Sequence, residues 1–191
     1  MRLAATIAAA ALAAAALTAP SSATAAPIEH GKFHDVETDV FTCESNGLPV
    51  GVVDDISGSF LLNQRGSSAF PYYRESVHGT TTWTNLNNGG TFTNVFTSNS
   101  RDHTIVDNGD GTITITSFRS GGSRFYDADG KLVLRDPGQV RVAFDVDYNG
   151  TPGNPDDDIE IPGSFRIVRP STGNSDFSQR DFCADLAEFT G

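Results

Sequence analysis

Hydrophobic and polar residues alternate with a period of two over much of the chain. Between positions 140 and 148, Val, Val, Phe, Val and Tyr occupy every second position, and Arg, Ala and Asp lie between them. In a β-strand this spacing puts the apolar side chains on one face and the others on the opposite face. Positions 112–116 and 159–161 repeat the pattern, with the β-branched residues that a half-buried strand favours. The chain is therefore predicted to be all-β.

Turn-forming residues separate the predicted strands. Gly, Asn, Asp and Pro cluster at 87–90, 108–111, 120–122, 129–130 and 136–138, where they provide the backbone angles of tight reversals. Strands joined by short turns become neighbours, so we expect a single-domain antiparallel up-and-down β-barrel of about eight strands, with a β-sandwich as the alternative. The predicted strands are 36–43, 49–63, 72–86, 91–106, 112–119, 123–128, 131–148 and 159–168.

The tail of the chain changes to a helical period. Its apolar residues fall on one helical face, and these are Phe182, Cys183, Leu186 and Phe189. Ser178 and, three residues later, Asp181 resemble a capping box. A short amphipathic helix is therefore predicted over about 179–189, lying against one rim of the barrel.

Cys43 and Cys183 are the two cysteines of the chain. In a secreted protein, two thiols most simply form one disulfide. Closing so long a loop restricts the unfolded chain by roughly 4 to 5 kcal/mol in the chain-entropy model. The bridge also requires the two Cα atoms to lie within about 7 Å, so we expect the two ends of the domain to meet.

The start of the chain predicts secretion. Arg2 precedes an Ala-rich apolar run over 3–17, and positions 23–25 read Ala-Thr-Ala, the small-x-small pattern of a signal peptidase site. We expect residues 1–25 to be removed, a loosely held leader over 26–35, and the barrel domain over 36–191. The apolar run is shorter than the ~20 residues that span a membrane, so the mature protein is expected to be soluble and extracellular.

The net charge of the chain limits the classes of partner that it is expected to bind. The chain has 24 Asp and Glu against 13 Lys and Arg, for a net charge of −11. Acidic balance argues against nucleic acid and anionic membranes, which need clustered basic residues, and the few basic residues are scattered along the sequence. We expect a monomer without membrane spans. The Ala-rich signal and small acidic domain are typical of secreted proteins from bacteria with GC-rich genomes.

One acidic stretch resembles a calcium-binding loop. Oxygen-bearing residues lie at positions 145, 147 and 149, and another lies at 156, the twelfth position of such a loop. The candidate metal ligands are Asp145, Asp147, Asn149, Asp156 and Glu160. However, same-face residues of a straight strand stand about 7 Å apart, too far to share one ion. The strand pattern through Asp147 therefore favours a solvated acidic hairpin over a bound cation, with Glu160 expected on the face of Asp145. No other cofactor is expected.

A second candidate site lies in the stretch FPYYRESVHGTTTW at 70–83. On a strand, one face would carry Tyr72, Arg74, Ser76 and His78, and the other would carry Tyr73, Glu75, Val77 and Trp83. Arg74 and His78 could hold an anion in a polar lumen, with Arg101 or His103 as partners on the next strand. Tyr72 and Trp83 could stack on a ligand. A row that simply faces solvent is the favoured alternative.

These features leave three function classes. We expect a secreted β-barrel that binds an unknown ligand or serves as an accessory module. A small cofactor-independent isomerase, cyclase or hydrolase is the alternative, with Arg74, Glu75, His78 and His103 as candidate catalytic residues. A structural or surface-interaction domain is the third class. The chain contains no Gly-x-Ser-x-Gly and no His-Glu-x-x-His motif.

Overall fold

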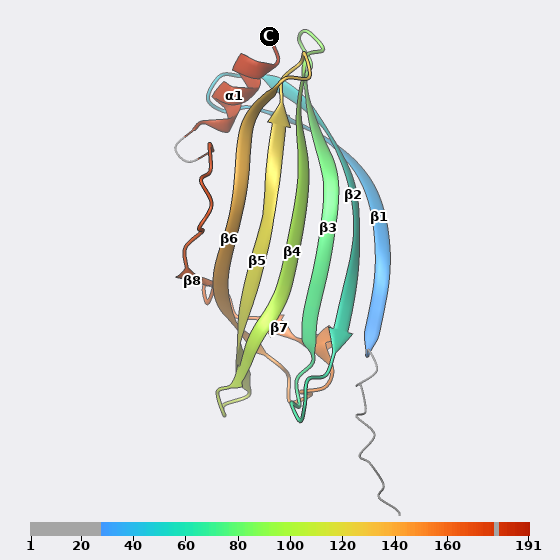
Figure 1. Cartoon of the computed structure of the whole chain (residues 1–191), viewed down its shortest axis with the longest axis vertical. Coiled ribbons are helices and arrows are strands. Elements are labelled where there is room, and N and C mark those ends of the chain that lie inside the picture. Colours follow the sequence, from blue (N-terminus) through green and yellow to red (C-terminus); the bar gives the residue numbers. More distant parts are fainter. Residues whose placement is uncertain (1–27, 178–179) are drawn as a thin grey trace, which may run out of the picture.

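Eight antiparallel strands and one short helix make up the described part of the protein, which is residues 28–177 and 180–191 of the computed structural model (Figure 1). The strands form a meander from β1 to β7, and β8 pairs with β6. Their bounds are β1 Glu29–Thr42, β2 Pro49–Asn63, β3 Tyr72–Asn85, β4 Thr91–Asp107, β5 Thr112–Tyr126, β6 Leu132–Asp147, β7 Ile159–Glu160 and β8 Arg166–Arg169, followed by the helix α1, Phe182–Phe189. The predicted all-β, up-and-down fold with a C-terminal helix is confirmed. Hydrogen bonds do not close the sheet, because β1 pairs only with β2 and β7 only with β6. The predicted signal peptide lies outside the described residues.

The sheet has two faces of different character. We call the face that carries the buried residues Phe92 and Ile113 the inner face, and the opposite one the outer face. Directly paired residues of neighbouring strands point to the same side, so the register of each strand pair assigns every side chain to a face.

One end of the inner face is packed beneath α1. Its fully buried residues include Val50, Phe92 and Leu186. Aromatic rings fill the space between sheet and helix, with ring centroids 5.0 Å apart for Trp83 and Phe182 and 5.4 Å apart for Phe92 and Phe189. We call this the closed end of the inner face.

The predicted disulfide lies at the closed end. Cys43 and Cys183 are bonded, with their Cα atoms 5.7 Å apart. The helix begins after Asp181, whose side chain accepts a hydrogen bond of 2.8 Å from the Ala184 amide. This N-cap satisfies one of the free amides of the first turn. The other half of the predicted capping box, Ser178, lies outside the described residues.

The predicted leader over 26–35 is corrected by the structure, because β1 already begins at Glu29 and pairs with Leu62 of β2. Gly31 lies directly opposite Phe60, and a Cβ on Gly31 would stand 2.6 Å from the Phe60 ring. The aromatic ring therefore covers a glycine of the edge strand, a packing arrangement that stabilises strand pairing where glycine leaves a gap.

The turns predicted at 120–122 and 136–138 are also corrected, because β5 and β6 run through them without interruption. Gly121 pairs with Ser98 of β4 on one side and Gly138 of β6 on the other. Its missing side chain lets the Thr97 carbonyl approach the Gly121 backbone closely. A glycine inside a strand here serves close backbone packing and not a reversal.

The strand predicted over 159–168 is two short pieces, β7 and β8, each paired with β6. Ile159 and Ile167, expected on a buried face, are 59% and 62% exposed. The interruption follows from Pro162, which lacks an amide, and Gly163, whose φ is +78°.

Candidate functional site

A cavity of about 730 Å³ occupies the half of the inner face that α1 leaves uncovered. We call this the open end. Its walls are apolar, formed by Phe60, Leu62, Phe70, Pro71, Ile105, Ile113, Ile115 and Phe144. Its polar lining is Glu29, Tyr73, Glu75, Ser98, Ser100, Asp102, Ser117, Arg119, Asp156 and Asp158. A cavity of this size with an apolar wall and a few polar groups is typical of a small-molecule site.

The register of three strands builds the polar floor. Glu75 of β3 pairs with Ser100 of β4, which pairs with Arg119 of β5. The carboxylate and the guanidinium thus stand two strand spacings apart, ~10 Å, and they form no ion pair with each other. The floor presents both groups to the cavity with a serine between them.

Asp102 is the most deeply buried acid of this floor, at 7% exposure. Its carboxylate accepts hydrogen bonds from the Tyr73 amide at 2.9 Å and from the Ser117 hydroxyl at 2.8 Å. Burial raises the pKa of Asp102, and these two hydrogen bonds offset only part of the rise. A β-bulge between Asp102 and Thr104 interrupts the register of β4 with β5 directly after this carboxyl.

Tyr73 and Glu75 form a second polar pair in the cavity. The Tyr73 hydroxyl donates a hydrogen bond of 3.1 Å to Glu75 Oε1. Burial, and after it the hydrogen bond to the Glu75 carboxylate, raise the pKa of Tyr73 to about 12. The phenol therefore stays protonated at neutral pH and serves as a donor.

The loop between β6 and β7 adds acid to the cavity. It contains the 3₁₀ helix η1, Pro155–Asp157, and it contributes Asp156 and Asp158 to the cavity lining. Burial, followed by repulsion from Asp157 and Asp147, raises the pKa of Asp158. Figure 1 shows this segment crossing the lower end of the sheet. The acidic stretch noticed in the sequence is thus part of the cavity.

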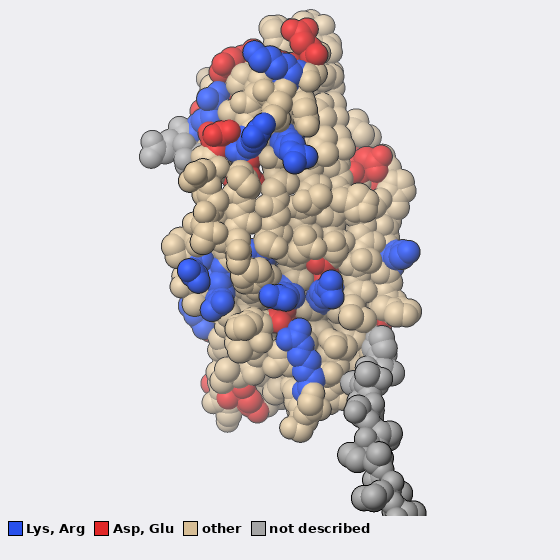
Figure 2. Space-filling view, viewed as in Figure 1, with Lys and Arg blue, Asp and Glu red and all other residues tan. Residues whose placement is uncertain are grey.

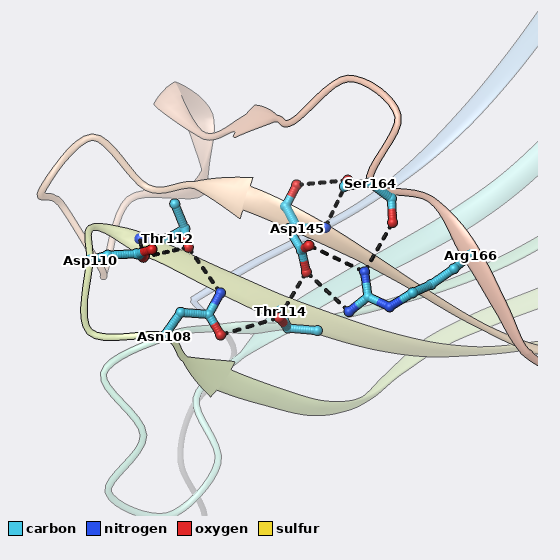
Figure 3. A network of polar contacts seen from close by, with 7 residues as sticks. All are labelled: Asn108, Asp110, Thr112, Thr114, Asp145, Ser164 and Arg166. Atoms are coloured by element: carbon cyan, nitrogen blue, oxygen red, sulfur yellow. Dashed lines mark hydrogen bonds and ion pairs between the residues drawn. The ribbon is translucent and has the colours of Figure 1, made fainter.

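Asp145 and Asp147 do not bend toward one ion, since β6 runs straight to Asp147. Asp145 instead faces Arg166, whose two terminal nitrogens each donate a hydrogen bond of 3.2 Å to it (Figure 3). Thr114 donates a further bond of 2.8 Å. The Arg166 guanidinium is the main cause of the lowered pKa of Asp145. An arginine occupies the position that a cation would take.

The remaining metal candidates are dispersed. Asp147 accepts a hydrogen bond from the Asn149 amide, and the Asn149 side chain bonds to the Asp157 carbonyl. Glu160 pairs with Val146, so it lies on the inner-face side and not on the face of Asp145 as expected. The correction follows from the length of the connecting loop, because a shift of one residue moves a side chain to the other face. No group of three metal-binding side chains exists within residues 28–177 and 180–191.

The second candidate site is divided between the two faces. Arg74 and His78 lie on the outer face, where Arg74 pairs directly with Arg101. Glu75 points into the cavity. Trp83 belongs to the packed closed end.

The other two candidates also lie away from the cavity. His103 is exposed within the β4 bulge. The Tyr72 ring is covered by the Arg65 guanidinium at 4.4 Å from the ring centroid. Of the candidate residues on β3 and β4, the cavity contains Glu75.

Sequence reasoning missed Asp102, Ser117 and Arg119. The available signal was a change along one strand face. In β5 the inner positions read Ile113, Ile115, Ser117 and Arg119, passing from apolar to polar within a single strand. All four residues line the cavity, so this change marks the place where its apolar wall meets its polar floor.

The chain matches no protein-family model, no curated protein and no solved structure. Within the described residues, no helix is long and apolar enough to cross a membrane.

Proposed function

We propose that this protein is a secreted binding module that holds a small amphipathic molecule with a basic nitrogen at the open end of its inner face. The observation that carries the proposal is the composition of the cavity. Apolar side chains form the walls, and five carboxylates accompany a single guanidinium, that of Arg119, in the lining. Such a cavity attracts an apolar body joined to a cationic group.

The acids are placed for this role at two depths. Asp102 and Glu75 lie on the floor, while Asp156 and Asp158 come from the loop that crosses the cavity. Burial and, after it, repulsion from neighbouring carboxylates raise the pKa of Asp158, and a cationic ligand would relieve that repulsion. An ammonium would also provide a counter-charge for the buried Asp102 carboxyl, which has no ion-pair partner among the described residues.

Binding of matched ligands tests the proposal. We expect isothermal titration calorimetry to give tighter binding of dodecylamine than of dodecanol or dodecanoic acid, which share the same apolar chain. Changing both Glu75→Gln and Asp102→Asn should weaken the amine by at least about tenfold, since hydrogen bonds to charged groups are lost. Glu44→Gln with Asp129→Asn, two exposed acids in turns, is the matched control and should bind as the wild type does. Equal or tighter binding of dodecanoic acid would reject the proposal.

Secretion has its own test. Protein purified from the culture medium of its source should have the mass of a chain that begins at Ala26, with the Cys43–Cys183 bond intact. Native mass spectrometry of the same sample should reveal any retained ligand. An uncleaved N-terminus would contradict secretion by the predicted signal.

The raised pKa of Asp102 favours a second candidate function, a small cofactor-independent enzyme. A carboxyl whose pKa is raised by burial holds its proton to higher pH than an exposed one, and it can donate that proton to a bound substrate. The Tyr73 hydroxyl, hydrogen-bonded to Glu75, would position that substrate. In this case Asp102→Asn would abolish turnover of a bound species and leave its binding nearly unchanged, whereas the binding module predicts a loss of affinity.

A further inference from the structure

The outer face carries a row of arginines that the sequence does not reveal. Arg74 of β3 pairs with Arg101 of β4, Arg101 pairs with Phe118 of β5, Phe118 with Arg141 of β6, and Arg141 with Arg169 of β8. Paired residues point to the same side of a sheet. The row therefore crosses five strands in a line, and basic side chains gather in a band across the middle of the near face in Figure 2. The sequence-based view that basic residues are scattered is corrected by this register.

The row is unusual because its charges are not balanced within the fold. None of these four arginines takes part in an ion pair in the described part of the chain. Arg141 Nε is buried and has no hydrogen-bond partner there. Like charges placed directly opposite each other destabilise a sheet. The chain has a net charge of −11, so acidic residues are plentiful, yet none pairs with these arginines among the described residues. A row that costs stability indicates selection for something outside the fold.

Two hollows lie along the row, and Phe118 lines both of them. One hollow, of about 420 Å³, is lined by Arg65, Arg74, Arg101 and Phe118, and Glu75 is the one acid that the described part of the chain adds to its lining. The other, of about 130 Å³, is lined by Phe118, Arg141 and Arg169 among others. The Arg101 guanidinium lies over the Phe118 ring, 5.1 Å from its centroid. Stacking engages the plane of a guanidinium and leaves its N–H edge available for two parallel hydrogen bonds to a carboxylate.

Beside the arginines runs a second row of uncharged polar residues. Ser76 pairs with Asn99, Asn99 with Ser120, and Ser120 with Gln139. These side chains can both donate and accept hydrogen bonds, as the hydroxyl groups of a sugar require. Single-stranded nucleic acid instead needs a series of aromatic rings on which successive bases stack, and Phe118 is the sole aromatic member of the two rows. The chemistry of the face therefore favours a charged sugar polymer.

We propose that the outer face binds a linear acidic polysaccharide whose chain lies across the strands. Carboxylates on its sugar units meet the arginines on either side of Phe118, and its hydroxyl groups meet the neighbouring polar row. The phenyl ring packs against one sugar face. The cavity lies on the opposite, inner face of the sheet, although Glu75 and Ser100 line both the cavity and the larger of the two hollows.

Titration of the full-length mature protein with polygalacturonate at low ionic strength tests the site. We expect binding that weakens with added salt, because bound counterions are released. Arg101→Gln with Arg141→Gln should weaken binding by at least about tenfold. The matched control is Arg124→Gln with Arg135→Gln, a directly paired couple on the same face but outside the row. That control carries the same change of charge and should bind within about twofold of the wild type.

Two further measurements separate recognition from charge and from misfolding. Arg101→Lys with Arg141→Lys keeps the charge but loses the planar fork, and it should still weaken binding by about threefold or more. The thermal midpoint of the Gln variant should equal or exceed that of the wild type, since the repulsion is removed. A lower midpoint would assign the row a structural role and overturn the proposal. So would equal losses in the control pair, equal binding of neutral dextran, or tighter binding of single-stranded DNA.

Discussion

The two ends of the inner face are built from the same strands but end in opposite states. At the closed end, Trp83, Phe92 and Phe125 meet the rings of the tail, and Leu186 is fully buried. At the open end, the continuation of the same strands presents Glu75, Asp102 and Arg119 to a cavity of about 730 Å³. Side chains of the protein itself fill the closed end, whereas the open end keeps a cavity.

The difference arises from what covers each end. The closed end is covered by α1. The disulfide between Cys43 and Cys183 attaches this helix to the residue that follows β1. The open end is crossed by an acidic loop, which adds two carboxylates to the cavity lining, and Tyr148 at the start of this loop packs against Phe70. An apolar cover completes a core, whereas a charged cover leaves water and space beneath it. The stability of the fold should therefore reside at one end and its ligand binding at the other.

Truncation of one large ring at each end should give the largest contrast. Phe92→Ala removes a fully buried side chain from the closed end and should lower the free energy of unfolding by about 3–5 kcal/mol. Phe144→Ala enlarges an existing cavity and removes contacts with the buried cluster of Phe70, Ile113 and Val146. Because the Phe144 ring is only half-buried, the change should cost about 1–2 kcal/mol. Urea denaturation measures both values. Equal losses would show that the two ends are equally packed.

Removal of the disulfide should affect the closed end selectively. Cys43→Ser with Cys183→Ser should lower the free energy of unfolding by about 2–4 kcal/mol, since the unfolded chain is no longer restricted. Amide hydrogen exchange should accelerate first in α1 and in the ends of β3, β4 and β5 that carry the aromatic rings beneath it. Ligand affinity at the open end should change little. Faster exchange in β7 before α1 would contradict the assignment.

Two aspartates should give opposite pH dependences. The raised pKa of Asp102 stabilises the fold fully below its ordinary value of 3.8, and this contribution is lost as pH rises through the folded-state pKa. The lowered pKa of Asp145 stabilises the fold above 3.8, and this contribution is lost as pH falls through the folded-state pKa.

Thermal midpoints measured across acidic pH test both signs. Asp102→Asn should gain stability relative to the wild type as pH rises above 3.8. The Asp145→Asn variant should instead lose less stability than the wild type as pH falls, because its contribution from the Asp145 carboxylate is already absent. Asp110→Asn provides a control for a turn carboxylate whose pKa is lowered by Thr112 and not by an arginine. Identical profiles for the Asp102 and Asp145 variants would refute the contrast.

The smallest expected effect is that of adding volume at the open end. Ser100→Val extends a side chain into the cavity and should change the free energy of unfolding by less than about 0.5 kcal/mol. Val50→Phe adds volume where no space exists and should cost about 1–3 kcal/mol. Chemical denaturation compares the two. A large loss for Ser100→Val would mean that the open end is tightly packed.

Local patterns predicted much of the fold but little of the candidate site. Alternation over 140–148 and the helical period around Leu186 were sufficient, because each depends on neighbours in the chain. Gly121 was assigned to a turn because a sequence does not show that Thr97 presses its carbonyl against that position. Asp102 and Arg119 were missed because only the register of β4 and β5 brings them into one cavity.

The sequence by itself determined the class of the fold, the cysteine pair and the short helix, because periodicity and residue chemistry act over a few positions. The tertiary structure alone decided which face each charge occupies and which charges meet. Arginines at 74, 101, 141 and 169 are far apart in the chain, and strand register aligns all four in one row with Phe118. Register depends on loop lengths and bulges across the whole sheet, and a shift of one residue would have sent each of these side chains to the opposite face.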